Sequence, residues 1–310
     1  MASASEVVVG VDGSPASLHA VDWAAEEARL RGASLRVVHA FIWPLLHVPL
    51  GPAPMAPPDA GLRNEALRVL GDAADRARRS VPGLEVTTDL RESAPAPALI
   101  GASQGAELLV VGNRGLGGFS GLLLGSVGVQ VSGHAACPVV VVRGREGTAP
   151  APAGPGEVLV GVDGSEQSHL AVGFGFAYAA RRGLGVAAVH AVRPGQPEGV
   201  EPSALADPAV PGGGDPAAAQ ARLLAEALVG WREKYPDVPV RSALVPGRPA
   251  EVLLRQAATA SLVVVGARGR GGFAGLLLGS VSQALLHHAP VPVAVVRASV
   301  ADPTGEGPTP

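Results

Sequence analysis

The segment GNRGLGGFSGLLLGS at residues 112–126 recurs as GARGRGGFAGLLLGS at 266–280, with twelve of the fifteen letters identical. Each copy follows an apolar run of strand length, ELLVVG at 107–112 and SLVVVG at 261–266. Each copy also ends on Gly-Ser, two residues that are favoured where a helix begins. The repeated unit is therefore a buried strand, a glycine-rich loop and a helix, and we expect the chain to contain it twice.

The repetition extends beyond this segment, because VVVGVDGSPAS at 7–17 matches VLVGVDGSEQS at 158–168. A period near 150 residues is too long for a solenoid unit, so the chain is expected to hold two whole domains. The sequence between the copies is rich in proline, alanine and glycine, as linkers are. We predict domain one at 1–146, a linker at 147–156, domain two at 157–300 and a disordered tail at 301–310.

Alternating strand and helix signals predict an α/β fold. Val7–Val11 is apolar without alternation, which favours a strand buried on both faces. Ser14 and Pro15 then predict a helix start, and Gly32 its end. Further strands are expected at 35–40, 84–90, 108–111 and 139–143, with helices at 62–79, at 95–104 and from Ser126. We therefore expect two tandem, open, five-stranded parallel sheets of Rossmann-like type, joined through their apolar fifth strands, VVVVR and VAVVR.

Composition excludes several classes of function. The net charge is −3 and no basic tract occurs, so we expect no nucleic-acid partner and no membrane partner. Cys137 is the sole cysteine, which excludes an intramolecular disulfide and a site built on several thiolates. We expect a buried structural role for it, with redox sensing as the alternative. No secretory signal or apolar stretch of membrane-spanning length is apparent, which predicts a cytoplasmic protein.

The glycine segments suit phosphate binding. Glycine lets backbone amides approach an anion closely, some glycines can adopt positive φ, and a helix N-terminus adds unpaired N–H groups. Ser126 and Ser280 are expected to cap these helices and to offer a hydroxyl to a phosphate. The segments are not P-loops, because no lysine follows Gly125 or Gly279 and Lys234 is the only lysine in the chain. A Rossmann fingerprint would follow the first strand of its unit, not the fourth.

The actual pattern is G-x2-G-x9-G-S, together with V-G-V-D-G-S at the first strand and V-H-A at the second. On these motifs the chain resembles the tandem form of the universal stress protein family, over about 6–143 and 157–297. The resemblance implies one adenine nucleotide per domain, ATP possibly with Mg²⁺, and a regulatory role in stress or growth arrest. It also implies a homodimer, which we place at the fifth-strand edges.

The resemblance implies that the glycine loop holds phosphates and ribose, and that the aspartate after strand one and the last residue of strand two contact adenine. In domain one the expected ligand-binding residues are Gly10, Asp12, Ala40, Gly112, Asn113, Arg114, Gly115, Leu116, Gly117, Gly118, Gly125, Ser126 and Val127. In domain two they are Gly161, Asp163, Ala191, Gly266, Ala267, Arg268, Gly269, Arg270, Gly271, Gly272, Gly279, Ser280 and Val281.

Several of these residues have simpler alternatives. Asp12 and Asp163 could instead brace the D-G-S turn, and Arg114 and Arg268 could be ordinary surface arginines. The LLL runs at 122–124 and 276–278 are expected to anchor the loops, with a membrane or partner contact as the alternative. Leu116 faces Arg270 in the alignment of the two copies, so the two sites need not be equivalent.

We predict a nucleotide-binding protein without catalytic residues or a metal site. No lysine is available to a phosphate, and no serine or cysteine is placed to pair with His39 or His190. The histidines 134, 287 and 288 do not form a metal-binding pattern. The alternatives are a slow ATPase or nucleotidyl transferase, and a scaffold that binds no nucleotide.

Overall fold

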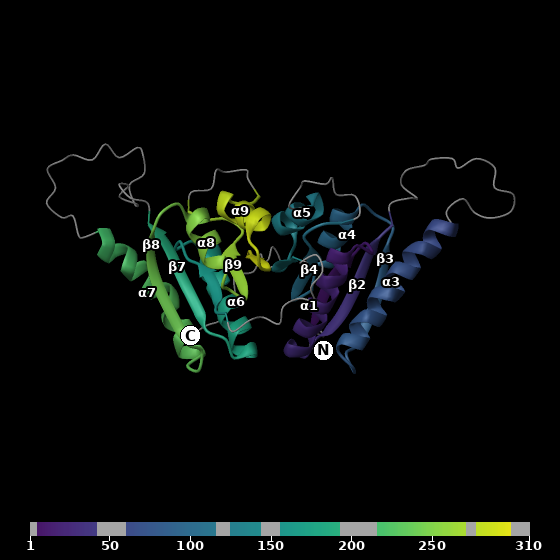
Figure 1. Ribbon diagram of the computed structural model, residues 1–310, viewed down its shortest axis with the longest axis horizontal. Helices are drawn as coiled ribbons and strands as arrows, with labels where there is room; N and C mark the ends of the chain where they lie inside the picture. The colour runs from purple at the N-terminus through teal and green to yellow at the C-terminus, as the bar shows by residue number, and fades with distance from the viewer. Residues whose placement is uncertain are drawn as a thin grey trace.

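The computed structural model describes residues 5–41, 60–115, 125–143, 156–192, 216–270 and 277–298. They form a ten-stranded sheet in the order β3-β2-β1-β4-β5-β10-β9-β6-β7-β8, with helices on both faces (Figure 1). The elements of the first half are β1 (Glu6–Val11), α1 (Pro15–Arg31), β2 (Ser34–Ala40), α3 (Ala60–Ser80), β3 (Val86–Arg91), α4 (Pro95–Ala102), β4 (Leu108–Gly112), α5 (Ser126–His134) and β5 (Val139–Val142). Those of the second half are β6 (Val158–Gly161), α6 (Glu166–Arg182), β7 (Val186–Val192), α7 (Pro216–Lys234), β8 (Val240–Pro246), α8 (Pro249–Ala257), β9 (Leu262–Gly266), α9 (Ser280–His288) and β10 (Val293–Val296).

Within each half, the described strands pair in parallel, which confirms the predicted α/β class and its tandem arrangement. Local signals explain the first helix. The Ser14 hydroxyl accepts a hydrogen bond from the Ser17 amide at 3.2 Å, Pro15 is the first helical residue, and Gly32 ends the helix at φ 65°. Helix α6 repeats this pattern with Ser165 as its N-cap and Gly183 as its C-cap, at φ 63°.

Each face of the sheet has its own apolar core, and each core continues through both halves. Helices α1, α3, α6 and α7 cover one face, where Val7 and Val9 point. Helices α4, α5, α8 and α9 cover the other, where Val8 points. Burial on both faces explains why the strands are apolar without alternation.

The two halves join through β5 and β10, which pair antiparallel with Val293 opposite Val141. This confirms the prediction that the fifth strands connect the domains. The same pairing corrects the predicted homodimer surface, because β5 lies between β4 and β10 and β10 lies between β5 and β9. Neither fifth strand has a free edge for a second chain. Homodimerisation through another surface stays a prediction.

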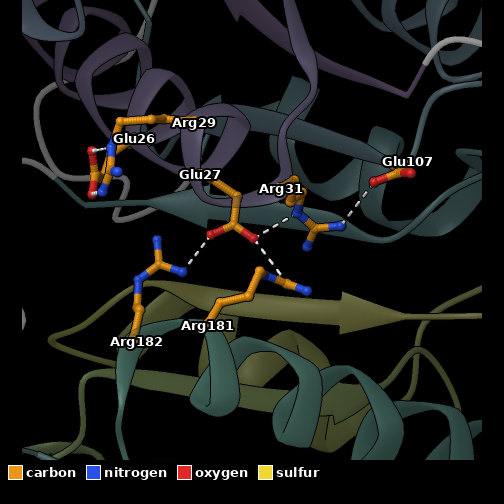
Figure 2. Close-up of polar contacts among 7 residues, drawn as sticks. All are labelled: Glu26, Glu27, Arg29, Arg31, Glu107, Arg181 and Arg182. Atoms are coloured by element: carbon orange, nitrogen blue, oxygen red, sulfur yellow. Dashed lines mark hydrogen bonds and ion pairs between the residues drawn. The ribbon is translucent and has the colours of Figure 1, made fainter.

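A buried ion cluster joins the halves on the face of α1 and α6 (Figure 2). The Glu27 side chain is fully buried. Its carboxylate lies 2.6 Å from Arg31 on the same helix, and 3.3 Å and 2.6 Å from Arg181 and Arg182 on α6. The Arg182 guanidinium also lies 3.9 Å from the centre of the Tyr178 ring, a cation–π contact. The interface therefore combines strand pairing with a charge cluster contributed by both halves.

Cys137 is buried, as predicted, in the core beneath α4 and α5. Burial raises the pKa of its thiol to about 12, so the reactive thiolate is scarce at neutral pH. Among the described residues no helix is long and apolar enough to cross a membrane. Over the same residues, no group of three or more histidine, cysteine, aspartate or glutamate side chains is placed to hold a metal ion.

Candidate functional site

The glycine segments begin at the carboxyl end of β4 and of β9, next to the first strand of each half. Gly10 of β1 pairs with Val111 of β4, and Val160 of β6 pairs with Val264 of β9. Strand β2 lies on the other side of β1, so the chain order reverses between β1 and β4. Open α/β sheets bind ligands at such a switch point. The structure therefore confirms that the first and fourth strands of each half are neighbours, which places the aspartate and the glycine loop at the same end of the sheet.

Asp12 braces the turn that begins α1. Its Oδ1 accepts a hydrogen bond from the Ser14 amide at 3.0 Å, and its own amide donates to the Ser17 hydroxyl at 3.4 Å. The Ser14 hydroxyl in turn donates to the carbonyl of Arg114 at 3.3 Å, which ties this turn to the glycine loop. The turn-bracing role, one of the two alternatives for Asp12, is thus present in the structure.

Asp163 makes the corresponding contacts and adds one to its own loop. Its Oδ1 accepts from the amide and the hydroxyl of Ser165, at 3.0 Å and 2.6 Å. Its Oδ2 accepts from the amide of Arg270 at 3.1 Å. The carboxylate therefore fixes both the helix start and the glycine loop of the second half.

At the described glycines of the two segments, close approach rather than positive φ explains why glycine is needed. A Cβ on Gly112 would lie 2.7 Å from the backbone carbonyl of Ala16, and one on Gly266 would lie 2.9 Å from the Gln167 side chain. A Cβ on Gly115 or Gly269 would collide with Oδ2 of Asp12 or Asp163. Positive φ occurs at the neighbouring D-G-S turns, at Gly13 (85°) and Gly164 (76°).

The helices after the loops begin with amides that no side chain of the described residues caps. Gly125 and Gly279 occupy the N-cap positions, and neither α5 nor α9 has a side-chain capping hydrogen bond. This corrects the expectation that Ser126 and Ser280 are caps, because each lies one residue inside its helix. Both serines are exposed, so their hydroxyls face solvent at the helix start. The geometry leaves the amides of the first turn available to an anion.

The other predicted residues that the structure describes fall into three groups. Gly10 and Gly161 lie beneath leucines of α4 and α8, since a Cβ would meet Leu99 at 2.7 Å or Leu253 at 3.0 Å. Ala40 is the last residue of β2, as predicted, whereas Ala191 lies one residue before the end of β7. The remaining described residues follow β4 and β9 or begin α5 and α9: Asn113, Arg114, Val127, Ala267, Arg268 and Val281. Leu116, Gly117, Gly118, Gly271 and Gly272 lie outside the described residues.

In the second half only, two side chains form hydrogen bonds to the backbone at the start of the glycine loop. Neither was predicted from the sequence. The Gln167 Oε1 accepts from the amide of Arg268 at 2.6 Å, and the Ser282 hydroxyl donates to the carbonyl of Gly266 at 2.7 Å. The matched positions in the first half are Ala16 and Gly128, which lack these side-chain groups. A position-by-position comparison of the two copies would have found both differences.

His39 and His190 have structural contacts, as expected. Their Nδ1 atoms lie 2.8 Å and 2.6 Å from the carbonyls of Val11 and Val162, which directly precede the aspartates. Leu278 of the second LLL run is buried in the core, in agreement with an anchoring role. The first LLL run, at 122–124, lies outside the described residues.

With this fold and loop geometry, comparison with known proteins identifies the class. The model of the universal stress protein family matches residues 4–143 and 156–297, so the chain belongs to that family in its tandem form. Universal stress protein Rv2005c of Mycobacterium tuberculosis is 41% identical over 308 residues, covering 94% of this chain and 97% of that protein. Universal stress protein Rv2623 of the same organism is 39% identical over 303 residues, covering 95% and 97%.

Among solved structures, a universal stress protein from Archaeoglobus fulgidus DSM 4304 superposes with a TM-score of 0.66. It is 19% identical and covers 94% of this chain and 98% of that one, which shows a shared fold. A universal stress protein solved in complex with cAMP is 32% identical and covers 46% of this chain and 98% of that one, at a TM-score of 0.35.

Proposed function

We propose that this tandem universal stress protein binds one adenine nucleotide in each half, as a regulatory binding protein rather than an enzyme. One observation carries the proposal. Twice in the chain, a glycine loop at a strand-order switch leads into a helix whose first-turn amides are capped by no side chain of the described residues. Such a helix start favours a phosphate through both its N–H groups and its dipole.

The aspartates are proposed to contact the adenine in addition to bracing the turn. Asp163 accepts three hydrogen bonds from its own chain, two at Oδ1 and one at Oδ2. An ionised carboxylate has about four acceptor positions, so Oδ2 retains one for the exocyclic amine of adenine. Turn bracing and ligand contact are therefore compatible at the same side chain.

The proposal that the protein is not a phosphoryl-transfer enzyme rests on its single lysine. Lys234 ends α7 just before β8, and its ammonium lies 5.3 Å from the Trp231 ring centre. That position is at the amino end of the strands, whereas the glycine loops lie at their carboxyl ends. A kinase or P-loop enzyme needs a lysine on the transferred phosphate. The rival slow ATPase predicts steady turnover that the Asp12→Ala, Asp163→Ala double variant abolishes.

The test is to denature the purified full chain and identify any released nucleotide by chromatography and mass spectrometry, followed by calorimetric titration of the nucleotide-free protein. We expect an adenine nucleotide in the released fraction or micromolar binding of Mg-ATP. The scaffold alternative predicts neither a released nucleotide nor binding heat, and that result would reject the proposal.

A further inference from the structure

Two arginines cross between the halves and bind the far ends of the helices that begin at the glycine loops. Arg143 directly follows β5, and its guanidinium donates to the carbonyl of Leu286, at 2.9 Å, and to that of His287. Arg297 directly follows β10 and donates to the carbonyl of Gly133. Leu286 and His287 lie in the last turn of α9, and Gly133 lies in the last turn of α5. Each helix therefore receives its C-terminal cation from the opposite half.

The same arginines are linked to the loop of their own half. The Asn113 amide donates to Val142, the residue before Arg143, at 2.9 Å, and the Ala267 amide donates to Val296, the residue before Arg297, at 2.7 Å. Burial lowers the pKa of Arg143, and the nearby charge of Arg114 lowers it further. Burial also lowers the pKa of Arg297, and the nearby charge of Arg268 lowers it further.

We propose that Arg143 and Arg297 are positioning residues that act in trans, so that each half completes the nucleotide site of the other. The inference rests on the proposed function. A cation that binds the last carbonyls of a helix stabilises the helix and its dipole, and it holds the helix in one orientation. The opposite end of that helix carries the first-turn amides of the glycine-loop site. Arg143 thereby supports site two through α9, and Arg297 supports site one through α5.

Packing adds a second link toward site two. Leu277 and Leu278 belong to the glycine segment of the second half, yet they contact α5 of the first. A Cβ on Gly133 would lie 3.3 Å from the Leu277 Cβ and 3.8 Å from the Leu278 Cγ, so the absence of a side chain at Gly133 leaves room for them. The two leucines that end the loop of site two thus pack on the helix that begins at site one.

The experiment separates the two sites with full-length variants. Gly269→Val is expected to eliminate site two, so that binding to site one is measured. Gly115→Val is expected to eliminate site one, so that binding to site two is measured. Arg143→Ala and Arg297→Ala are each combined with both backgrounds, and Mg-ATP binding is measured by calorimetry. We expect Arg297→Ala to weaken site one, and Arg143→Ala to weaken site two, by about threefold or more, with a smaller loss at the site of the arginine's own half, to which the preceding strand residue links it.

General destabilisation would weaken both sites alike, so the crossed pattern is specific to action in trans. Arg143→Gln and Arg297→Gln, which keep much of the side-chain length but remove the cation, serve where an alanine variant fails to fold and are expected to show the same crossed pattern. Equal losses at both sites, losses confined to the arginine's own half, or no loss would overturn the inference. If neither Gly115→Val nor Gly269→Val binds Mg-ATP before an arginine is changed, the proposed function fails instead. That outcome is therefore distinguishable from a failure of this inference.

Discussion

Glu27 of α1 and Arg182 of α6 form an ion pair of 2.6 Å across the two halves, with the glutamate fully buried. Removing one partner of a buried pair leaves the others uncompensated, at a cost of about 3–5 kcal/mol. We expect Glu27→Gln to lower the free energy of unfolding by about that amount in urea titrations, because Arg181 and Arg182 would lose their carboxylate and Arg31 would keep only its longer contact to Glu107, at 3.4 Å.

Glu26 provides the matched control, since it is a neighbouring glutamate with a side chain 46% exposed and an ion pair to Arg29 on its own helix. Glu26→Gln is expected to change stability by less than about 1 kcal/mol. Equal effects of the two variants would show that the cluster does not stabilise the association of the halves.

Because Tyr178 is buried beside this cluster, we expect the folded protein to lose stability at alkaline pH. Burial raises its pKa to about 12 in the folded protein. The unfolded chain has a tyrosine pKa of about 10, so it loses the proton first as pH rises. Stability from this group is therefore complete below about pH 10 and is lost between about pH 10 and 12. Thermal unfolding measured across this range should show a smaller decline in Tyr178→Phe than in the parent protein.

Cys137 also has a raised pKa and contributes alkaline instability of the same sign. It is present in both proteins, so the difference between the parent and Tyr178→Phe isolates the tyrosine. Identical declines in the two proteins would contradict the assignment.

Gly115→Val and Gly269→Val should each eliminate one nucleotide site. The added Cβ would collide with the Asp12 or Asp163 carboxylate, so the loop must move away from the turn. Calorimetry should then give half the parent's stoichiometry for either single variant. Gly71→Ala, within α3, is the control, because apart from its chain neighbours and the helix backbone no atom of the described residues lies within 4 Å of the added Cβ. That control should keep the parent's stoichiometry and gain up to about 1 kcal/mol in stability.

Asp163→Ala should lower stability, because it removes three hydrogen bonds that fix the helix start and the loop. A loss of about 1–3 kcal/mol in the free energy of unfolding is expected. Asp237→Ala, at an exposed turn, should change it by less than about 0.5 kcal/mol. A stability loss no larger than that of the control would show that the carboxylate does not brace the turn.

The sequence was sufficient for the fold because its signals are local and occur twice. Ser14, Pro15 and Gly32 mark the ends of α1 through backbone chemistry alone. The third strand was predicted from Leu84 but begins at Val86, because the Leu84 amide donates to the Val81 carbonyl at 3.2 Å in the preceding turn. An apolar residue packed beneath a helix looks the same in sequence as the first residue of a strand.

The pairing of the fifth strands was predictable, but several side-chain contacts between distant segments were not. Glu27 has the pattern of a solvent-facing helix residue, and only the association of α1 with α6 buries it. The capping serines were misassigned because Gly-Ser does not reveal which residue takes the non-helical backbone. The reason for the glycines at 115 and 269 also required the position of the aspartate carboxylates.

The central claim is that the chain carries two adenine-nucleotide sites, and native mass spectrometry of the full chain with Mg-ATP tests it most directly. The parent protein should gain the mass of two nucleotides, and the Gly115→Val, Gly269→Val double variant should gain none while keeping its fold. A parent spectrum without bound nucleotide, or a double variant that binds as the parent does, would contradict the claim.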